Sequence, residues 1–219
     1  AFIIKGLYYR NLKIKTEQNI LLITELANRL LQMYRHEQHD DWHWFESYLT
    51  YANSLLPEAM LYAWLVTENI VYRKTAIDTF DFLISKTFSE TRIRVISNQN
   101  WLHDGRVVTK KKNGGEQPID VAYSILALSK FFDVFKAKNY RTKMDIAFNW
   151  FLGANHLHQI IYNPCTGGCY DGLEEDYVNL NQGAESTVSY LMARLTVEKL
   201  QRNRRRVEEQ KNHAFYFNL

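Results

Sequence analysis

Apolar residues recur at helical spacing along most of the chain. Residues 17–36 carry an apolar residue at every third or fourth position, and Thr16 is placed to cap the first turn. Pro57 and Pro118 suit the first turn of a helix, and Gly153 suits a left-handed helix end. The same spacing predicts further helices over residues 54–66, 69–87, 118–135, 140–152 and 184–202. We therefore expect an all-α fold.

Two stretches depart from this periodicity. Residues 92–96 and 106–109 alternate polar with β-branched side chains, which predicts a short β-hairpin or two extended arms within residues 92–109. Residues 154–182 are polar and rich in Gly, Asn, Asp and Tyr, and a loop this long in a compact domain is usually functional or disordered. Helix pairs joined by alternately short and elaborate loops suggest one domain over residues 1–219, a closed or partly closed ring of helical hairpins.

Charge, hydropathy and cysteine content narrow the class of protein. A net charge of +3, concentrated in basic runs at 110–112 and 202–206, is too small to indicate a nucleic-acid partner. No apolar run is long enough to span a membrane.

Cys165 and Cys169 could form only a small local disulfide, and two cysteines in 219 residues favour a reducing compartment, so we expect a cytoplasmic protein. We expect no metal or other cofactor, because this pair lacks further ligands at zinc-like spacing. The chain begins at Ala1 inside a plausible structured segment, so we expect that the N-terminal part of a parent protein is missing.

The aromatic content is high, with 14 Tyr, 12 Phe and 5 Trp, and some of these rings stand beside acids. Residues 40–46 hold two aspartates, two tryptophans, a histidine and a glutamate. In one interpretation Trp42 or Trp44 stacks on a sugar while Asp41 or Glu46 binds hydroxyls or moves protons; in the other, the tryptophans simply pack. Further candidates for substrate binding are Tyr51, Asn53 and Trp101.

Two later segments carry polar groups that a core does not need. Residues 115–120 begin a helix, where acids favour the helix dipole, but Gln117 is harder to explain and is a candidate for binding. In residues 165–187, glycines allow close backbone approach to a ligand, and Asp171 with Glu185 is a plausible acid/base pair. The alternative is a turn-rich loop in which Asn181 caps the next helix. Candidates for reading sugar hydroxyls here are Tyr170, Asn179, Asn181 and Gln182.

Several of these segments together resemble one known family. In chain order they are DWHWFE from residue 41, LTYAN from 49, LPEA from 56, QPID from 117, WFLGAN from 150, TGGCYDGL from 166 and NLNQGAEST from 179. They resemble a bacterial domain of the six-hairpin glycosidase-like type, which often follows a nucleotide-sugar glycosyltransferase domain and also occurs alone. The resemblance implies an α/α toroid whose central cavity faces carbohydrate. Cys165 stands where this family has an acidic residue, and the chain is short for a complete ring.

The leading hypothesis for function is a domain that binds an oligosaccharide and cleaves or remodels it with paired carboxylates. The candidate catalytic residues are Asp41, Glu46, Asp171 and Glu185, without assignment of acid or base, and the separation of the pair would distinguish inversion from retention. The alternative is a non-catalytic glycan-binding module that serves an associated glycosyltransferase. A terpenoid-cyclase-like toroid fits the aromatic content, but the many amides and hydroxyls disfavour it. A helical protein-interaction scaffold remains a fourth hypothesis.

Overall fold

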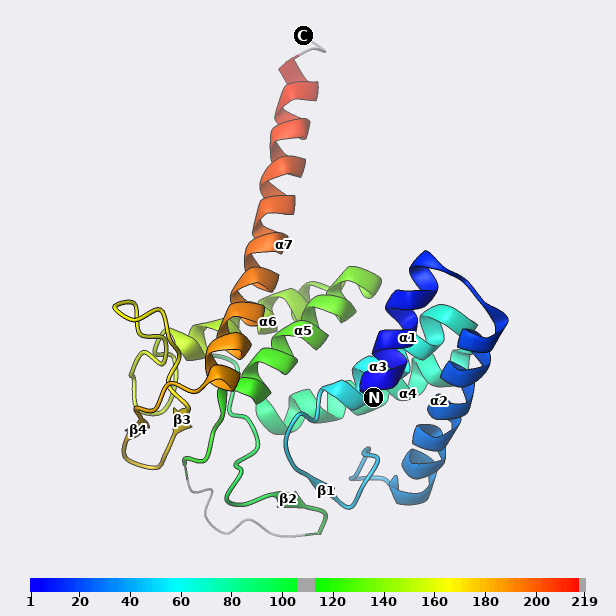
Figure 1. Cartoon of the computed structure of the whole chain (residues 1–219), viewed down its shortest axis with the longest axis horizontal. Coiled ribbons are helices and arrows are strands. Elements are labelled where there is room, and N and C mark those ends of the chain that lie inside the picture. The colour runs from blue at the N-terminus through cyan, green and yellow to red at the C-terminus, as the bar shows by residue number, and fades with distance from the viewer. Residues whose placement is uncertain (106–112, 217–219) are drawn as a thin grey trace.

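A computed structural model describes residues 1–105 and 113–216, with side chains up to residue 202, and this part of the chain is mainly helical (Figure 1). The helices are α1 (Phe2–Lys13), α2 (Glu17–Glu37), α3 (Leu55–Thr67), α4 (Ile70–Thr87), α5 (Pro118–Phe135), α6 (Lys138–Phe151) and α7 (Ala184–Tyr216). The short strands are β1 (Tyr48–Leu49), β2 (Leu102–His103), β3 (Gly172–Leu173) and β4 (Val178–Asn179). The expectation of a mainly helical fold is confirmed.

The helix starts follow local sequence signals. Thr16 caps α2, because its side-chain oxygen accepts a hydrogen bond of 3.2 Å from the backbone N–H of Asn19. Asn69 caps α4 in the same way, accepting from the N–H of Val71. Pro118 occupies the first turn of α5, and Gly153 follows α6 with a φ of 105°. These local predictions are therefore confirmed.

The two terminal helices differ from what the periodicity predicts. No helix was expected over Phe2–Lys13, because its apolar residues are spread around the helix, with Ile4 buried but Phe2 and Leu12 exposed. The predicted end of the last helix at residue 202 is wrong, since α7 runs on to Tyr216 and projects beyond the other helices (Figure 1). Half of the added residues are Arg, Glu, Gln or Lys, which have high helix propensity. None of the described helices is long and apolar enough to cross a bilayer.

The helices form two packed rows. α1, α3, α5 and α7 lie next to one another in this order, each packing against the next. α2 packs on α1 and α3, α4 on α3, and α6 on α5 and α7, so the even-numbered helices cover one side of the first row. Phe80 of α4, Phe131 of α5 and Tyr140 of α6 meet in the core between the rows, with the first two ring centroids 4.2 Å apart. This aromatic packing joins α4, α5 and α6 in the core.

The strands are short and lie mostly outside the predicted hairpin. Antiparallel pairing joins β1 to β2 and β3 to β4, so residues 48–49 pair with 102–103 rather than with a neighbouring segment. Within residues 92–96, Ile93 forms only an isolated bridge with Phe88. The second predicted arm, 106–109, lies outside the described residues. The prediction of extended structure over 92–96 is therefore met by one bridge and no strand.

Candidate functional site

The site is centred on Asp120, in the first turn of α5. Its side chain is buried, and Oδ1 accepts a 2.5 Å hydrogen bond from the backbone N–H of Ala52, in the loop before α3. Ala52 has a φ of 52°, a left-handed conformation that costs energy for a residue with a Cβ. Such backbone strain persists only where surrounding contacts maintain it, and Asp120 provides such a contact. The loop before α3 is thus fastened to the start of α5.

Burial raises the pKa of Asp120 to about 7. The hydrogen bond from Ala52 opposes this shift, and the negative charge of Glu185 adds to it. Glu185 is exposed in the first turn of α7, which packs against α5. A carboxyl group with a pKa near neutrality can both donate and accept a proton at physiological pH. Asp120 is therefore a candidate for proton transfer, and Glu185 is the acid whose charge acts on it.

Tyr123, one turn further along α5, has a hydroxyl whose pKa is affected by the same two acids. Burial raises the pKa of its hydroxyl, and the charges of Glu185, Glu58 and Asp120 raise it further. Acids from α3, α5 and α7 thus all raise the pKa of one phenol. The convergence places the N-terminal parts of these three helices at one end of the row, as Figure 1 also shows for α5 and α7.

Glu58 is compensated by neighbours from α1 and α3. Its side chain is 3% exposed, and Lys5 Nζ lies 2.9 Å from Oε2 and 3.1 Å from Oε1. The Tyr62 hydroxyl donates to Oε1 at 3.1 Å, and the Tyr9 hydroxyl lies 3.0 Å from that of Tyr62. A buried carboxylate with an ammonium partner and a further donor remains charged at modest cost. Lys5 and Tyr62 therefore satisfy the buried Glu58 carboxyl from α1 and α3.

Glu116 connects α5 to the long loop after α6. Its side chain is 4% exposed; Oε2 accepts from Trp150 Nε1 at 2.9 Å, and Oε1 lies 3.3 Å from His156 Nδ1. His156 Nε2 lies 2.9 Å from the carbonyl oxygen of Glu174, which can only accept. The interaction with Glu116 raises the pKa of His156, against the opposing effect of burial. Nε2 faces a carbonyl acceptor with hydrogen-bond geometry, whereas Nδ1 lies close to the Glu116 carboxyl without hydrogen-bond geometry.

Asp171 ties residues 171–186 together. Oδ1 accepts from the Gly183 N–H at 2.8 Å and from the Ser186 hydroxyl at 2.6 Å, and Oδ2 accepts from Asn181 Nδ2. Burial would raise the pKa of Asp171, but the bonds from Ser186, Asn181 and Gly183 outweigh it and hold the pKa below its ordinary value. Since both oxygens already accept hydrogen bonds, the carboxylate is a poor proton donor. The pairing of Asp171 with Glu185 as acid and base is not supported by this geometry.

The neighbouring polar residues also bind within the loop. Asn179 Oδ1 accepts from the backbone of Asn181, Gln182 Oε1 accepts from the Thr166 hydroxyl, and the Tyr170 hydroxyl accepts from an Asn163 amide. A Cβ at Gly183 would lie 2.9 Å from Asp171 Oδ1, so this glycine admits the protein's own carboxylate rather than a ligand. Hydrogen bonds within the loop therefore account for these amide and hydroxyl groups.

The tryptophan-acid cluster is divided between core and surface. Trp42 is 4% exposed and donates from Nε1 to the carbonyl oxygen of Glu46, while Trp44 is fully buried with its ring 5.4 Å from that of Phe45. The expectation that either indole forms a sugar platform is therefore wrong, because neighbouring side chains cover both rings. Asp41 is exposed. Burial and the charge of Glu37 raise the pKa of Glu46, which is half-buried.

Trp101, unlike Trp42 and Trp44, is exposed to solvent. It is 45% exposed, and its ring stacks on Tyr48 with centroids 5.6 Å apart and planes 18° from parallel. The β1–β2 pair positions both rings. A cavity of about 230 Å³ adjoins it, lined by Asn98, Gln99, Asn100, Trp101 and His103. A ring backed on one face and bordered by amides can bind a sugar face by stacking.

Three other predicted binding residues lie in the loops around Asp120. Tyr51 is 64% exposed immediately before Ala52, and Asn53 exchanges hydrogen bonds with the backbone of Thr50 to close the same turn. Gln117 is half-buried at the N-cap of α5 and makes no capping bond with its side chain. Tyr51 is therefore exposed next to the residue that binds Asp120, and Gln117 lies three residues before Asp120 in the chain.

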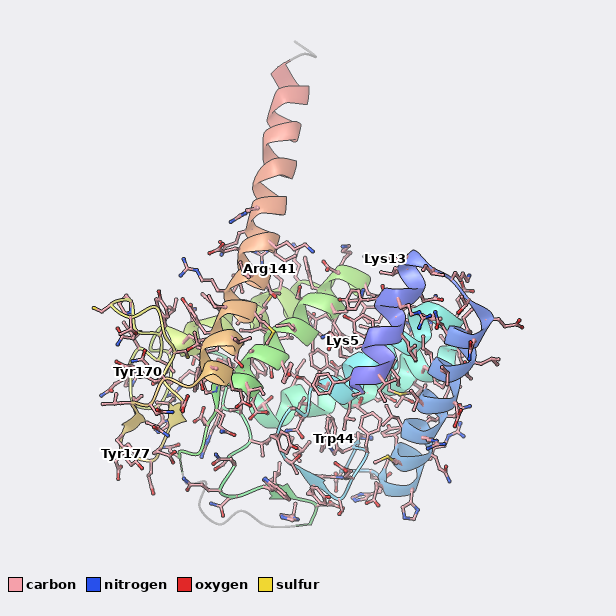
Figure 2. The ribbon with its side chains drawn as sticks, viewed as in Figure 1. Lys5, Lys13, Trp44, Arg141, Tyr170 and Tyr177 are labelled. Carbon is pink, nitrogen blue, oxygen red and sulfur yellow. The ribbon has the colours of Figure 1, made fainter. Side chains whose placement is uncertain are left out.

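The sequence predicted that the early tryptophan cluster would face the late amide-rich segment. Figure 2 shows Tyr170 at the left of the molecule and Trp44 at its lower centre-right, so these members do not meet. The two segments do approach each other elsewhere, because Asp120 binds Ala52 and lies within electrostatic reach of Glu185. Asp120 of α5 thus links Ala52, near the end of the first segment, with Glu185, near the end of the second.

Sequence reasoning missed three carboxylates: Glu58, Glu116 and Asp120. Glu58 had a usable signal, since it is the one charged residue among residues 55–66, an apolar helix. Asp120 had none, because an acid near a helix N-terminus is ordinary and its burial depends on the loop that covers it. In the part of the chain described with side chains, no three His, Cys, Asp or Glu residues lie close enough to hold a metal ion.

Cys165 and Cys169 are both free thiols, the first exposed and the second buried. Comparison of the chain with models of known protein families and with curated proteins finds no match.

Proposed function

We propose that the chain forms part of an α/α toroid that binds an oligosaccharide and hydrolyses a glycosidic bond. The observation that carries the proposal is Asp120, a buried carboxyl group that accepts from the Ala52 N–H and whose pKa burial and the charge of Glu185 raise to about 7. Glycoside hydrolysis requires one carboxylic acid that protonates the leaving oxygen and one carboxylate that activates water or attacks the sugar. Asp120 is assigned the first role and Glu185 the second.

The pattern of helix packing supports the toroid. α1, α3, α5 and α7 form a row covered on one side by even-numbered helices, which is how inner and outer helices are arranged in stacked helical hairpins. The loops before α3, α5 and α7 gather at the Asp120 end of this row. Loops that meet at one end of a rigid helical scaffold are a common place for catalytic groups.

Substrate binding is assigned to the exposed groups around the pair. Trp101 would stack on a sugar ring, while Asn98 and Asn100 in the adjoining cavity offer amide donors and acceptors. Tyr51 and Gln117 lie nearer to Asp120 and would contact the sugar at the bond that is cleaved. Asp171 is given a positioning role, since it fixes the start of α7 and hence Glu185.

The test is turnover by single variants of the intact chain. Oligosaccharides of different sugars are incubated with wild type, Asp120→Asn, Glu185→Gln and the control Glu175→Gln, which changes an exposed acid outside the pair. Released reducing ends are measured. We expect the first two variants to lose roughly 10²- to 10⁴-fold in rate, the range for a general acid or base, and the control to keep its rate. Full activity of Asp120→Asn would remove it as the acid.

A second candidate function is a glycan-binding module that serves an associated glycosyltransferase. It is favoured by the cavity beside Trp101, whose lining contains three amide side chains and no carboxylate. In that case wild type would bind oligosaccharides on an array without releasing any product, and Asp120→Asn would bind equally well. Turnover of any bound glycan by wild type, lost in Asp120→Asn, would decide for the hydrolase.

A further inference from the structure

The cavity beside Trp101 is lined in part by Gln99, whose side-chain amide is held by Glu174 from the β3–β4 loop. Gln99 Nε2 donates to Glu174 Oε2 at 2.6 Å, although the two residues are 75 positions apart in the chain. The cavity measures about 230 Å³. Drug-sized ligands usually occupy about 300–1,000 Å³, so this cavity suits a single sugar residue. The way Gln99 is held decides which group of that sugar it can bind.

The bond to Glu174 fixes the orientation of the Gln99 amide. A carboxylate has only acceptors, so the amide nitrogen must face it and the amide oxygen must point elsewhere. Among the residues described with side chains, none donates a hydrogen bond to Gln99 Oε1. This oxygen is therefore the atom of the Gln99 side chain that remains for a ligand, and it can only accept.

The backbone of the same loop is fastened separately. The Asn98 N–H donates to the Gly115 carbonyl oxygen at 2.9 Å, and the Gln99 N–H donates to Ser97 Oγ at 3.2 Å. A Cβ at Gly115 would lie 2.7 Å from Asn98 Oδ1, so the glycine permits this close packing. Because the backbone and the side chain of Gln99 are both held, its acceptor is in place before a ligand binds, which reduces the entropy lost on binding.

The charges around the cavity disfavour a negative ligand. Among the described residues, no aspartate, glutamate, lysine or arginine lines it; the lining is Asn98, Gln99, Asn100, Trp101 and His103. Glu174 carries its negative charge one hydrogen bond away from Gln99. A carboxylate on the ligand would face this charge and the Gln99 oxygen without a lysine or arginine in the lining to offset them. A hydroxyl needs no counter-ion and can donate to the same oxygen.

We propose that Glu174 and Gln99 restrict the Trp101 cavity to an uncharged sugar, whose hydroxyl donates to Gln99 Oε1, and reject sugars that carry a carboxylate. The ligand is the oligosaccharide of the proposed function, so the inference rests on that proposal. It adds the class of substrate, a neutral sugar rather than a uronic acid. Gln99 contacts the sugar, and Glu174 is a positioning residue that acts through Gln99.

Isothermal titration calorimetry on the intact chain compares tetrasaccharides of glucose, mannose and galactose with those of the matching uronic acids in the same linkage. The variant is Glu174→Gln, and the control is Glu175→Gln, which removes the same charge from the next residue, an exposed glutamate. We expect wild type and the control to bind a neutral tetrasaccharide about tenfold more tightly than its uronic counterpart. In Glu174→Gln the Gln99 amide can turn its nitrogen to the ligand, so the ratio should fall to about one.

Gln99→Ala is a second variant, which keeps the charge of Glu174 and removes the acceptor. It should bind the neutral tetrasaccharide about tenfold more weakly than wild type, with little change for the uronic acid. Thermal unfolding confirms that each variant folds, and Gln99→Ala serves if Glu174→Gln does not.

Tighter binding of a uronic acid tetrasaccharide by wild type would overturn the proposal, and so would the absence of binding of all three neutral tetrasaccharides at millimolar concentration. An equal change of the ratio in Glu174→Gln and Glu175→Gln would show that general charge, and not the orientation of Gln99, sets the preference. Released reducing ends are measured separately. The expected ratios without any release would remove hydrolysis and keep the neutral-sugar site, whereas release with equal ratios in all variants would keep hydrolysis and remove the role of Glu174.

Discussion

Ala52 and Asp120 stand 68 residues apart in the chain, and the backbone N–H of the first donates directly to the side chain of the second. This bond fastens the loop before α3 over the first turn of α5 and takes the carboxyl group out of water. Burial then raises the pKa of Asp120 to about 7, with a further contribution from Glu185. One contact between two loops thus creates the titratable group on which the proposed chemistry depends.

Asp120→Asn is expected to change how stability depends on pH. The folded-state pKa of Asp120 is raised above its ordinary value of 3.8, so the folded protein binds the proton more tightly than the unfolded chain does. The free energy of unfolding of wild type should therefore fall as pH rises from about 4 to 7, by about 4 kcal/mol from this group. Asn keeps an oxygen for the Ala52 N–H but does not titrate. Urea unfolding across this range should show a smaller fall in the variant, and equal slopes would contradict the burial of a titrating Asp120.

Asp171→Ala is expected to destabilise the long loop. It should not abolish turnover, as the loss of a catalytic acid would. Three donors, on Asn181, Gly183 and Ser186, lose their acceptor, which should lower the free energy of unfolding by about 2 kcal/mol. The pKa of Asp171 is lowered in the fold, so its contribution is present above about pH 4 and is lost as pH falls through the folded value. Ser186→Ala, which removes one donor, should cost less. A variant with unchanged stability but no turnover would return Asp171 to the catalytic residues.

His156→Gln tests the ion pair with Glu116. The folded-state pKa of His156 is raised, so its stabilising effect is fully present below about pH 6.5 and is lost as pH rises through the folded value. The variant should therefore be less stable than wild type near pH 5.5 and close to it near pH 9 in urea unfolding. His36→Gln, an exposed histidine at the end of α2, is the matched control and should match wild type at both. A deficit that does not change with pH would mean that His156 packs as a neutral ring.

Trp101→Ala is expected to weaken glycan binding by about tenfold, because the stacking face is lost while the fold is kept. Tyr177→Ala removes another exposed ring, 63% exposed in the β3–β4 loop, and is the control. Quenching of tryptophan fluorescence on addition of oligosaccharide reports on Trp101 directly and should disappear in the variant. Equal affinity of both variants would place the sugar elsewhere.

The sequence predicted local structure well and the site only in part. Thr16 and Asn69 mark helix starts through bonds within their own turn. Pro118 marks one because its fixed φ suits the first turn, so these starts could be recognised without knowledge of the fold. Glu185, predicted as a catalytic acid, lies exposed at the start of α7, and its role stays a prediction. Trp42 and Trp44 were misjudged, because a ring that stacks on sugar and a ring that packs in a core have the same sequence context.

By itself, the sequence determined the helices from α2 to α6 and the start of α7, since apolar periodicity and caps act over a few residues. It also placed the polar loops between them. Only the tertiary structure decided which acids are buried and which rings are open: Asp120 is covered by the Ala52 loop, and Trp101 is set against Tyr48 by strands from distant segments. The burial and the pKa of a side chain depend on residues that are distant in the sequence. The spacing of residues along the chain does not reveal which of these residues will be its neighbours.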